Sequence, residues 1–326
     1  MPQPIMSQIH ANRPLTNMSV AYRQSDKDFI TDRVSNVVDV QNKSHTYFKF
    51  NKEDWFRDDM QERAVGSESA GTGFNMSTDS YQCRSYALHI DIPDEHRENA
   101  DDPINLDRAA VDLLTRKAML QRDVLWQSKF FATGKWATDW SGQAATNYGA
   151  GQVKKWDLSG SNPMMDCEQI KLTVHTLTGL RPNVMVVAPD THAVLLNNAE
   201  ILDRVKYTQR GVITNELLAS MFGMDDYVVA NAIKNTAKEG AATAFAGSRV
   251  FSDGALFLYK PPAVGVEVPS ALANFQWSGK SGAMKGMRVR RIRMEHLESD
   301  RIELSFSYDL KLIGTDLGLF VNDLIG

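Results

Sequence analysis

Histidine is the first side chain to consider for chemistry, because it can act as an acid, a base or a metal ligand near neutral pH. No two histidines of this chain have metal-ligand spacing with a cysteine or carboxylate beside them, and a lone histidine is most often a satisfied structural group. We therefore expect neither a metal site nor a catalytic histidine. The seven are His10, His45, His89, His96, His175, His192 and His296.

Two glycine-containing stretches match nucleotide-binding motifs only in part. Gly279-Lys280-Ser281 resembles the end of a phosphate-binding P-loop, but Asn274 stands where that pattern requires its first glycine, and we expect no hydrophobic strand directly before it. Gly71-Thr72-Gly73 lacks the third glycine of a dinucleotide fingerprint and precedes no predicted helix. We therefore expect no cofactor and no enzymatic activity.

Carboxylates gather in one polar stretch of the chain. Paired carboxylates can do acid–base chemistry if one of them is buried, but here no apolar pocket residues surround them. The stretch is better interpreted as an acidic surface that faces solvent or a partner. Its acids are Glu53, Asp54, Asp58, Asp59, Glu62, Glu68 and Asp79.

Five basic residues stand within nine positions near the C-terminus. They are compatible with binding of nucleic acid, with pairing to the acidic stretch of a neighbouring chain, or with a plain charged surface strand. The doublet Arg290-Arg291 breaks the strand alternation and predicts a bulge. The five residues are Lys285, Arg288, Arg290, Arg291 and Arg293.

The composition is that of an ordinary folded protein, with 43% hydrophobic and 23% charged residues. A net charge of −4 is too small to mark a dedicated nucleic-acid binder, and no apolar run is long enough to span a membrane. Two cysteines, Cys83 and Cys167, are too few for a disulfide framework and predict free buried thiols in a reducing cytoplasm. The chain length of 326 residues predicts two lobes or one lobe with long extensions.

The first third of the chain has little core of its own. Residues 1–43 are polar without a sustained period, and we expect them to lie on a neighbouring subunit. His45–Phe50 reads as a strand, residues 51–79 as a polar arm with a Gly-Ser tip, and Tyr81–Ile92 as a returning strand. Together they predict a long two-stranded arm that needs a partner surface.

A long helix follows at about residues 103–133. Asp102-Pro103 supplies a start signal and Gly134 a stop, which gives a length of about 40 Å. The predicted apolar face, interrupted by Lys117, consists of Leu106, Ala110, Leu113, Leu120, Val124 and Phe131.

The second half alternates between helix and strand and then ends in β-structure. Residues 137–165 read as a loop with one short strand at most, and helices are predicted at 166–178, 190–204 and 214–222. Strands are predicted at 183–188, 226–233 and 255–260, which indicates a compact α/β lobe. Strict alternation from Ile302 to Leu312 predicts a half-buried strand, preceded by a turn at 298–300 and a strand at 287–297.

This order of elements resembles the major capsid protein of tailed bacteriophages, the Hong Kong 97-like fold. The most specific stretches are Tyr86–Asp94 running through Glu98-Asn99-Ala100-Asp101 into the long helix, the helix end Leu125–Phe131, and Glu200–Tyr207. The resemblance covers about residues 30–326 and implies an α+β fold. Its parts would be an N-terminal arm (1–43), an E-loop hairpin (44–92), a peripheral domain with the spine helix and the following loop (93–182), an axial domain (183–285), and long C-terminal strands that belong to the peripheral domain and return to the axial domain (286–326).

The resemblance implies a structural protein that assembles with itself, in pentamers and hexamers, into an icosahedral shell around double-stranded DNA bound without sequence specificity. It also implies a scaffold protein, a portal and a decoration or cement protein as partners, no membrane, and assembly in the bacterial host cytoplasm before residence in the virion. The alternative with the same fold is an encapsulin-like compartment. The tip from Gln61 to Ser80 contains no lysine, so we expect none of the covalent cross-links that some family members form. The E-loop residues expected to contact a neighbour are Trp55, Arg57, Asp58, Asp59, Glu62, Arg63 and Glu68.

Overall fold

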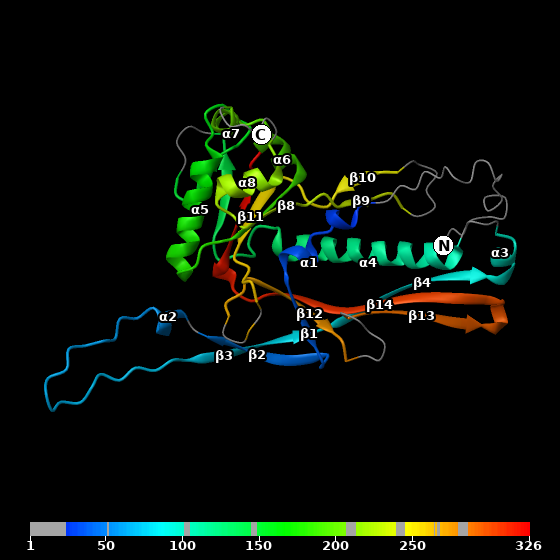
Figure 1. Cartoon of the computed structure of the whole chain (residues 1–326), viewed down its shortest axis with the longest axis horizontal. Coiled ribbons are helices and arrows are strands. Elements are labelled where there is room, and N and C mark those ends of the chain that lie inside the picture. The colour runs from blue at the N-terminus through cyan, green and yellow to red at the C-terminus, as the bar shows by residue number, and fades with distance from the viewer. Residues whose placement is uncertain are drawn as a thin grey trace.

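The computed structural model describes residues 24–50, 52–100, 105–144, 149–206, 213–238, 245–263, 265, 268–279 and 286–326. Figure 1 shows three parts: a long sheet with one long helix on it, an upright lobe with its own sheet, and a thin arm that extends beyond the long sheet. The fold is of the α+β type that the sequence predicts.

The long sheet is organised around β14 (Ser299–Leu312). Strands β12 and β13 pair with successive stretches of one edge of β14, β4 pairs with its other edge, and β1 pairs with β12. The remaining strands are β1 (Asn36–Val40), β4 (Arg84–Pro93), β12 (Leu272–Trp277) and β13 (Met287–Met294). Only β1 and β12 pair in parallel; β14 pairs antiparallel with each of its neighbours.

The alternation that predicts β14 is confirmed, since Ile302, Leu304 and Phe306 are buried against the long helix. The predicted bulge is wrong, because β13 pairs with β14 without interruption from Met287 opposite Phe306 to Met294 opposite Ser299. The phase break marks instead a strand with arginines on both faces. The turn lies slightly earlier than predicted, in a short 3-10 helix at Glu295–Leu297 and at Glu298, whose φ is 43°.

Strand β12 was not predicted from the sequence. Its side chains Asn274 and Gln276 are fully buried, so the strand has polar residues where a core-facing pattern would show apolar ones. It ends two residues before Gly279, which corrects the expectation that no strand precedes the Gly-Lys-Ser stretch. Lys280 and Ser281 lie outside the described residues, and the next described element is strand β13, not the helix that a P-loop requires.

The long helix α4 spans Leu106–Phe130. Its N-cap is Asn105, whose side chain accepts the backbone N–H of Arg108 at 2.9 Å; the predicted start at Asp102-Pro103 lies outside the described residues. The buried face differs from the predicted one, because Leu113 is 47% exposed whereas its neighbour Leu114 is 1% exposed. The buried residues of α4 are Ala110, Leu114, Arg122, Asp123, Trp126 and Phe130.

The buried face of α4 differs from the predicted one because the helix packs on a second segment as well as on the long sheet. Residues 24–36, here called the N-terminal strap, cross over the C-terminal half of the helix. The Asp123 carboxylate accepts the backbone N–H groups of Ile30 and Thr31 at 3.0 and 3.1 Å and the Thr31 hydroxyl at 2.5 Å. The indole N–H of Trp126 donates to the Ser35 hydroxyl at 2.9 Å. Two sides of the helix are therefore covered there.

For residues 24–36, the strap corrects the expectation that residues 1–43 lie on neighbouring subunits. It contains a 3-10 turn (Asp26–Asp28) and α1 (Thr31–Val34), and it leads directly into β1 of the chain's own sheet. Ile30 and Val34 are 0% and 1% exposed in the chain's own core. Residues 1–23 lie outside the described residues.

The upright lobe has a mixed sheet in the order β6-β5-β15-β11-β7-β8, confirming the predicted α/β lobe. The predicted loop at 137–165 contains two short strands at the sheet edge. Its strands are β5 (Asp139–Gln143), β6 (Gln152–Lys154), β7 (Val184–Val187), β8 (Asp226–Val229), β11 (Gly254–Leu258) and β15 (Gly318–Asn322), and a separate ribbon is formed by β9 (Ile233–Asn235) and β10 (Gly247–Arg249).

The helices of the lobe pack on the sheet through a second hydrophobic core that includes Ile170, Leu195 and Phe257. Helix α5 begins three residues earlier than predicted, because Asn162 caps it and Pro163 occupies its first turn; it ends at Gly179 as expected. The helices are α5 (Pro163–Thr178), α6 (Pro189–Leu196), α7 (Ala199–Val205) and α8 (Asn215–Phe222), and a 3-10 turn at Thr315–Leu317 precedes β15.

The arm is rooted in a hairpin of β2 (Ser44–Phe50) and β3 (Met76–Gln82), paired from Ser44 opposite Gln82 to Phe50 opposite Met76. The predicted returning strand is divided at the buried Cys83, with β3 in the hairpin and β4 in the long sheet. The root packs on β12, where the rings of Tyr81 and Phe275 stack with centroids 4.5 Å apart.

Candidate functional site

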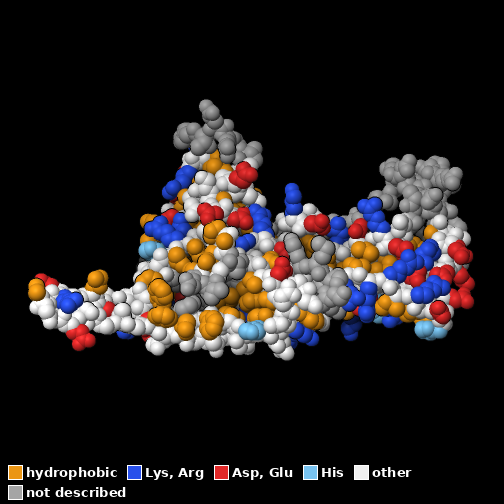
Figure 2. Space-filling model, turned by 60° about the horizontal axis from the view of Figure 1, so that its bottom comes forward, with side chains coloured by type: hydrophobic (Ala, Val, Ile, Leu, Met, Phe, Trp, Pro, Cys, Tyr) orange, Lys and Arg blue, Asp and Glu red, His pale blue; other side chains and the backbone are white. Residues whose placement is uncertain are grey.

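The arm, from its hairpin to its tip, exposes many large apolar side chains. It contains the one-turn helix α2 (Lys52–Trp55) and two extended legs without a strand ladder, and Figure 1 shows it projecting away from the body. In Figure 2 hydrophobic side chains lie uncovered along it. The exposed fractions are 58% for Phe48, 66% for Trp55, 66% for Phe56, 94% for Met60, 108% for Val65, 61% for Phe74 and 55% for Met76.

The legs of the arm are tied together by some of its acids. Asp54 accepts the backbone N–H of Asn75 at 2.7 Å, and Asp59 accepts the Thr72 hydroxyl at 2.8 Å. Near the root, the Tyr47 hydroxyl donates to Asp79 at 2.8 Å, and this bond lowers the pKa of the Asp79 carboxyl.

The expected contact residues of the E-loop thus divide into two groups. Asp59 has a role inside the arm, and Arg63 donates to the backbone carbonyl of Ser67 at the tip at 2.5 Å. Among the described residues no hydrogen bond or ion pair holds Arg57, Asp58, Glu62 or Glu68, all of which are exposed. Trp55 packs on Phe74, with ring centroids 6.3 Å apart.

The base of the arm rests on the chain's own body. Lys52 forms an ion pair with Asp316, in the turn that leads into β15. A Cβ atom added to Gly179 would lie 3.0 Å from the ring of Phe56, so the end of α5 needs glycine both for its φ of 70° and for this approach. The arm therefore leaves the body in a defined direction although its outer part touches little.

The basic strand β13 is largely neutralised within its own chain. Arg290 binds Glu303 directly across the strand pair, at 3.1–3.2 Å, on the sheet face that points away from α4. Arg291 and Arg293, on the other face, both pair with Asp300. The charge of +5 counted from sequence therefore overstates what the strand offers a partner.

Those two arginines belong to a charged cluster at the start of α4. Arg97 bridges Asp300 at 2.8 Å and Asp107 at 3.1 Å, and Arg293 binds Asp94, in α3 (Asp94–Glu98), at 2.7 Å. The arginines around Asp300, Arg291 foremost, lower the pKa of its carboxyl to about 2. Figure 2 shows acidic and basic side chains gathered at this end of the molecule. The sequence did not reveal the acidic half of the cluster, because its members Asp94, Asp107 and Asp300 come from three separate elements, α3, α4 and β14.

Arg288 is the exception on the strand. It forms no ion pair with the part of the chain that the structure describes, and by register it shares the face of Arg290. Lys285 lies outside the described residues.

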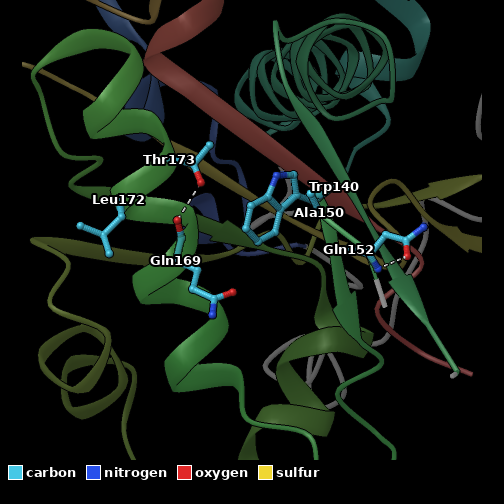
Figure 3. A pocket seen from close by; sticks show the side chains of 8 residues that line it. Trp140, Ala150, Gln152, Gln169, Leu172 and Thr173 are labelled. Carbon is cyan, nitrogen blue, oxygen red and sulfur yellow. Dashed lines mark hydrogen bonds between the residues drawn. The ribbon is translucent and has the colours of Figure 1, made fainter. Parts of the chain in front are cut away.

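The described residues contain no cluster of three or more histidines, cysteines or carboxylates that could hold a metal ion, and none of their helices is both long and apolar enough to cross a membrane. Figure 3 shows a shallow hollow between α5 and the β5–β6 connection, lined by Trp140, Ala150, Gln152, Gln169, Leu172 and Thr173, none of which titrates near neutral pH. Burial raises the pKa of the Cys83 thiol to about 11, so this group is protonated at neutral pH and a poor nucleophile.

A buried carboxyl in the lobe has a structural role. Asp166 is 4% exposed and accepts the indole N–H of Trp156 at 3.0 Å. Burial raises the pKa of this carboxyl to about 6. It holds one tryptophan beneath α5, and its side chain is closed off from solvent.

Comparison with known proteins matches this architecture. No family model matches the chain. The major capsid protein of Burkholderia phage BcepMu is 27% identical over 228 residues, which cover 67% of this chain and 68% of that protein. A phage-related protein from Bordetella bronchiseptica RB50 superposes with a TM-score of 0.65 at 21% identity, over 93% of this chain and 94% of the other. The capsid of cyanophage P-SCSP1u does so with a TM-score of 0.61 at 10% identity, over 95% and 91%.

The fold is shared more widely, since the SrpI encapsulin from Synechococcus elongatus PCC 7942 superposes with a TM-score of 0.54 at 10% identity, over 96% of each chain. That likeness concerns the fold alone, whereas the Burkholderia phage protein is similar in sequence as well. Together, the superposed structures show that the chain has the Hong Kong 97-like fold of tailed-phage capsid proteins, and its sequence is similar to that of a phage major capsid protein.

Proposed function

We propose that the chain assembles, as pentamers and hexamers of itself, into the icosahedral shell around the double-stranded DNA of a tailed phage, and that the arm of each subunit docks on its neighbour. In this proposal residues 1–43 form the N-terminal arm, 44–92 the E-loop, 93–182 the peripheral domain with the spine, 183–285 the axial domain, and 286–326 the C-terminal strands. The strap within 24–36 remains on its own subunit.

The observation that carries the proposal is the arm itself. Seven of its large apolar side chains are more than half exposed, on a segment whose outer legs have no core. Burying one such side chain fully is worth about 1.5–3 kcal/mol, so several of them supply a large part of an obligate interface. A second copy is the partner that is always present where the subunit is made.

Strand β13 has one of two roles in this proposal. Its exposed face holds Arg288 and the pair of Arg290 with Glu303. This face either receives acidic residues of a neighbour, such as Asp58 and Glu62, or faces the packaged DNA. Either role uses exposed charges, so salt should weaken it. Changing Arg288 to Glu separates the two, because a docking role predicts failed assembly and a genome-facing role predicts normal empty shells that hold less DNA.

Further partners follow from the family and remain proposals: a separate scaffold protein, a portal, and a decoration or cement protein. We propose that assembly takes place in the cytoplasm of the bacterial host. We also propose that the subunits are not covalently linked, since the arm tip lacks lysine. Boiled, reduced particles should then run as one band near 36.4 kDa, and a ladder of multimers would contradict this.

Electron microscopy of the purified protein tests the main proposal. We expect closed icosahedral particles, with nuclease-protected double-stranded DNA inside particles made during infection. An encapsulin-like role predicts a packaged protein instead of DNA. Elution as a small oligomer under every condition would overturn both.

The arm has its own test. A variant that removes residues 58–72 and joins the legs by an Asn-Gly turn keeps the contacts of Asp54 and Trp55 near the root. It should yield a folded subunit that does not form shells. Normal shells from this variant would show that the arm is not the docking element.

A further inference from the structure

The edge of the upright lobe's sheet that faces the long sheet is a row of residues paired across four strands. Gly318 of β15 lies opposite Leu258 of β11, Leu258 opposite Val184 of β7, and Val184 opposite Asp226 of β8. With strands about 4.8 Å apart, the two ends of this row, Gly318 and Asp226, are separated by about 14 Å. The lobe therefore has two feet that are held in different ways.

The first foot, at Gly318, is tied to the long sheet by the chain itself. Residues 313–317 join β14 to β15, and residues 259–271 lead from β11 to β12. The Trp136 ring packs on Gly318 so closely that a Cβ atom there would overlap it, and the Trp136 indole N–H donates to the carbonyl of Phe130, at the end of α4, at 2.8 Å. From β8, by contrast, the chain runs within the lobe in both directions, to α8 and to β9.

The second foot, at Asp226, is held by the N-terminal strap. The Arg33 guanidinium donates to both oxygens of the Asp226 carboxylate, from Nε at 3.0 Å and from a terminal nitrogen at 2.5 Å. Beside this pair, the Lys260 ammonium donates to the backbone carbonyl of Arg33 at 2.5 Å. Arg33 thus binds the lobe with both its side chain and its backbone.

A further contact lies at the start of the strap. The side-chain amide of Gln24 donates to the carbonyl of Ile233 in β9 at 2.5 Å and accepts the N–H of the same residue at 3.1 Å. On its other side, Arg116 of α4 donates to the Gln24 carbonyl and pairs with Asp26 at 3.0 Å. Figure 1 shows this part of the strap, in blue, between the β9–β10 ribbon and α4. Gln24 therefore links the lobe to the long helix.

The strap is bound more firmly to α4 than to the lobe. Its anchor on α4 is buried, since Ile30 and the Asp123 carboxylate that accepts its N–H are both 0% exposed. On the lobe side, 53% of the Arg33 side chain and 32% of the Asp226 side chain are exposed. Exposed ion pairs contribute little to stability and are weakened by salt. We call the two lobe contacts, Gln24 with Ile233 and Arg33 with Asp226, the clasp.

The clasp limits how far the lobe can turn. A rotation of about 10° about the first foot would move Asp226 by about 2.5 Å, more than its hydrogen bonds to Arg33 can stretch. The apolar contacts beneath the lobe, such as Phe251 on Trp126 with ring centroids 5.8 Å apart, have no comparable directional requirement. The hydrogen bonds of the clasp are therefore the contacts that select one angle.

We propose that the clasp sets the angle between the upright lobe and the long sheet, and that it opens while the strap stays anchored on α4. With the clasp closed, the lobe stands on both feet and takes one angle. With the clasp open, the lobe is held at the first foot and takes a range of angles. This device acts within one subunit and goes beyond the proposed function, so it is tested on dispersed full-length subunits.

Spin labels on the two parts of the molecule measure this angle. Leu113→Cys on α4 and Leu202→Cys on α7 place the labels at side chains that are 47% and 46% exposed, and the two native cysteines are buried. Double electron–electron resonance should give one narrow distance distribution for the labelled parent. Adding Gln24→Ala and Arg33→Ala together should at least double the width of that distribution.

The matched control is Arg290→Ala. Arg290 forms a similarly exposed, two-fold hydrogen-bonded pair with Glu303, and this pair lies wholly within the long sheet. The control should leave the distribution as narrow as in the parent, and equal broadening in the control would refute the proposal. Exchanging the charges, with Arg33→Asp and Asp226→Arg, keeps a reversed pair and should keep the distribution narrow.

Amide hydrogen exchange separates the clasp from the anchor. In the double alanine variant the N–H of Ile233 loses its acceptor and should exchange at least ten times faster. The N–H groups of Ile30 and Thr31, bound to Asp123, should keep the parent rate. A distance distribution as narrow as the parent's would overturn the proposal, since the apolar contacts would then fix the angle. Faster exchange at Ile30 and Thr31 would also overturn it, because the anchor would open with the clasp.

Discussion

Removing the carboxylate of Asp123 should loosen the N-terminal strap from the spine helix. The side chain is 0% exposed and accepts two backbone N–H groups and one hydroxyl of the strap. In Asp123→Ala both N–H groups lose their acceptor, at a cost of about 1–3 kcal/mol each. Relief from burying a carboxyl, whose pKa is raised by that burial, offsets part of this cost. We therefore expect a loss of about 2–4 kcal/mol in the free energy of unfolding.

The assay is urea unfolding of unassembled subunits, followed by tryptophan fluorescence, with amide hydrogen exchange at Ile30 and Thr31. Asp123→Asn retains one acceptor oxygen and should lose about half as much. Lys117→Ala, on the exposed side of the same helix, should change stability by less than about 0.5 kcal/mol. The reasoning is wrong if the free energy of unfolding of Asp123→Ala lies within about 0.5 kcal/mol of the parent's and its strap amides stay protected. The strap would then be held by other contacts.

Three further outcomes are expected. Deleting residues 2–40 should destabilise the folded subunit as well as block assembly, because the buried Ile30 and Val34 are lost; a stable, folded deletion variant by circular dichroism would contradict this. For Asp300 the folded pKa of about 2 lies below the unfolded value, so its contribution is present above about pH 4 and is lost as pH falls toward 2. Acid unfolding of Asp300→Asn should therefore differ from the parent at pH 5 and converge with it near pH 2. For Asp166 the folded pKa of about 6 lies above the unfolded value, so ionisation weakens the fold as pH rises from about 4 to 6; Asp166→Asn should be more stable than the parent at pH 8 by about 1–2 kcal/mol and equal to it at pH 4.

The sequence predicted the elements whose signal is local. The alternation from Ile302 to Leu312 identified β14, and the glycine stop at Gly179 identified the end of α5, since each depends on neighbours a few residues away. The arrangement of these elements in space could not be predicted from any one of them. It was predicted from the resemblance of their order to that of the tailed-phage capsid proteins.

The elements that it missed depend on contacts between distant residues. Residues 24–36 include few apolar side chains, so the sequence shows no core-forming pattern there. The segment is held by hydrogen bonds to buried groups of α4, such as the Asp123 carboxylate. The exposed Leu113 contradicts the predicted buried face of α4, because the helix is covered on two sides, by the long sheet and by the strap, and its buried residues follow both. At the candidate site the arm's exposure was predicted, but Asp300, Asp94 and Glu303 were missed because pairing across strands is invisible to a count of charges.

Strand β14 joins the upright lobe to the far end of the long sheet, so a small rotation near the lobe moves that end by several ångströms. It extends for about 46 Å from the foot of the upright lobe, where five residues, Ile313 to Leu317, connect it to β15 in the other sheet. A rotation of about 5° at that junction would move the far end, with its cluster of arginines and aspartates, by about 4 Å. In the proposed closed shell, where one chain would occupy positions of different local curvature, small angular changes at this short connection would be enough to alter the radius at which neighbouring subunits meet.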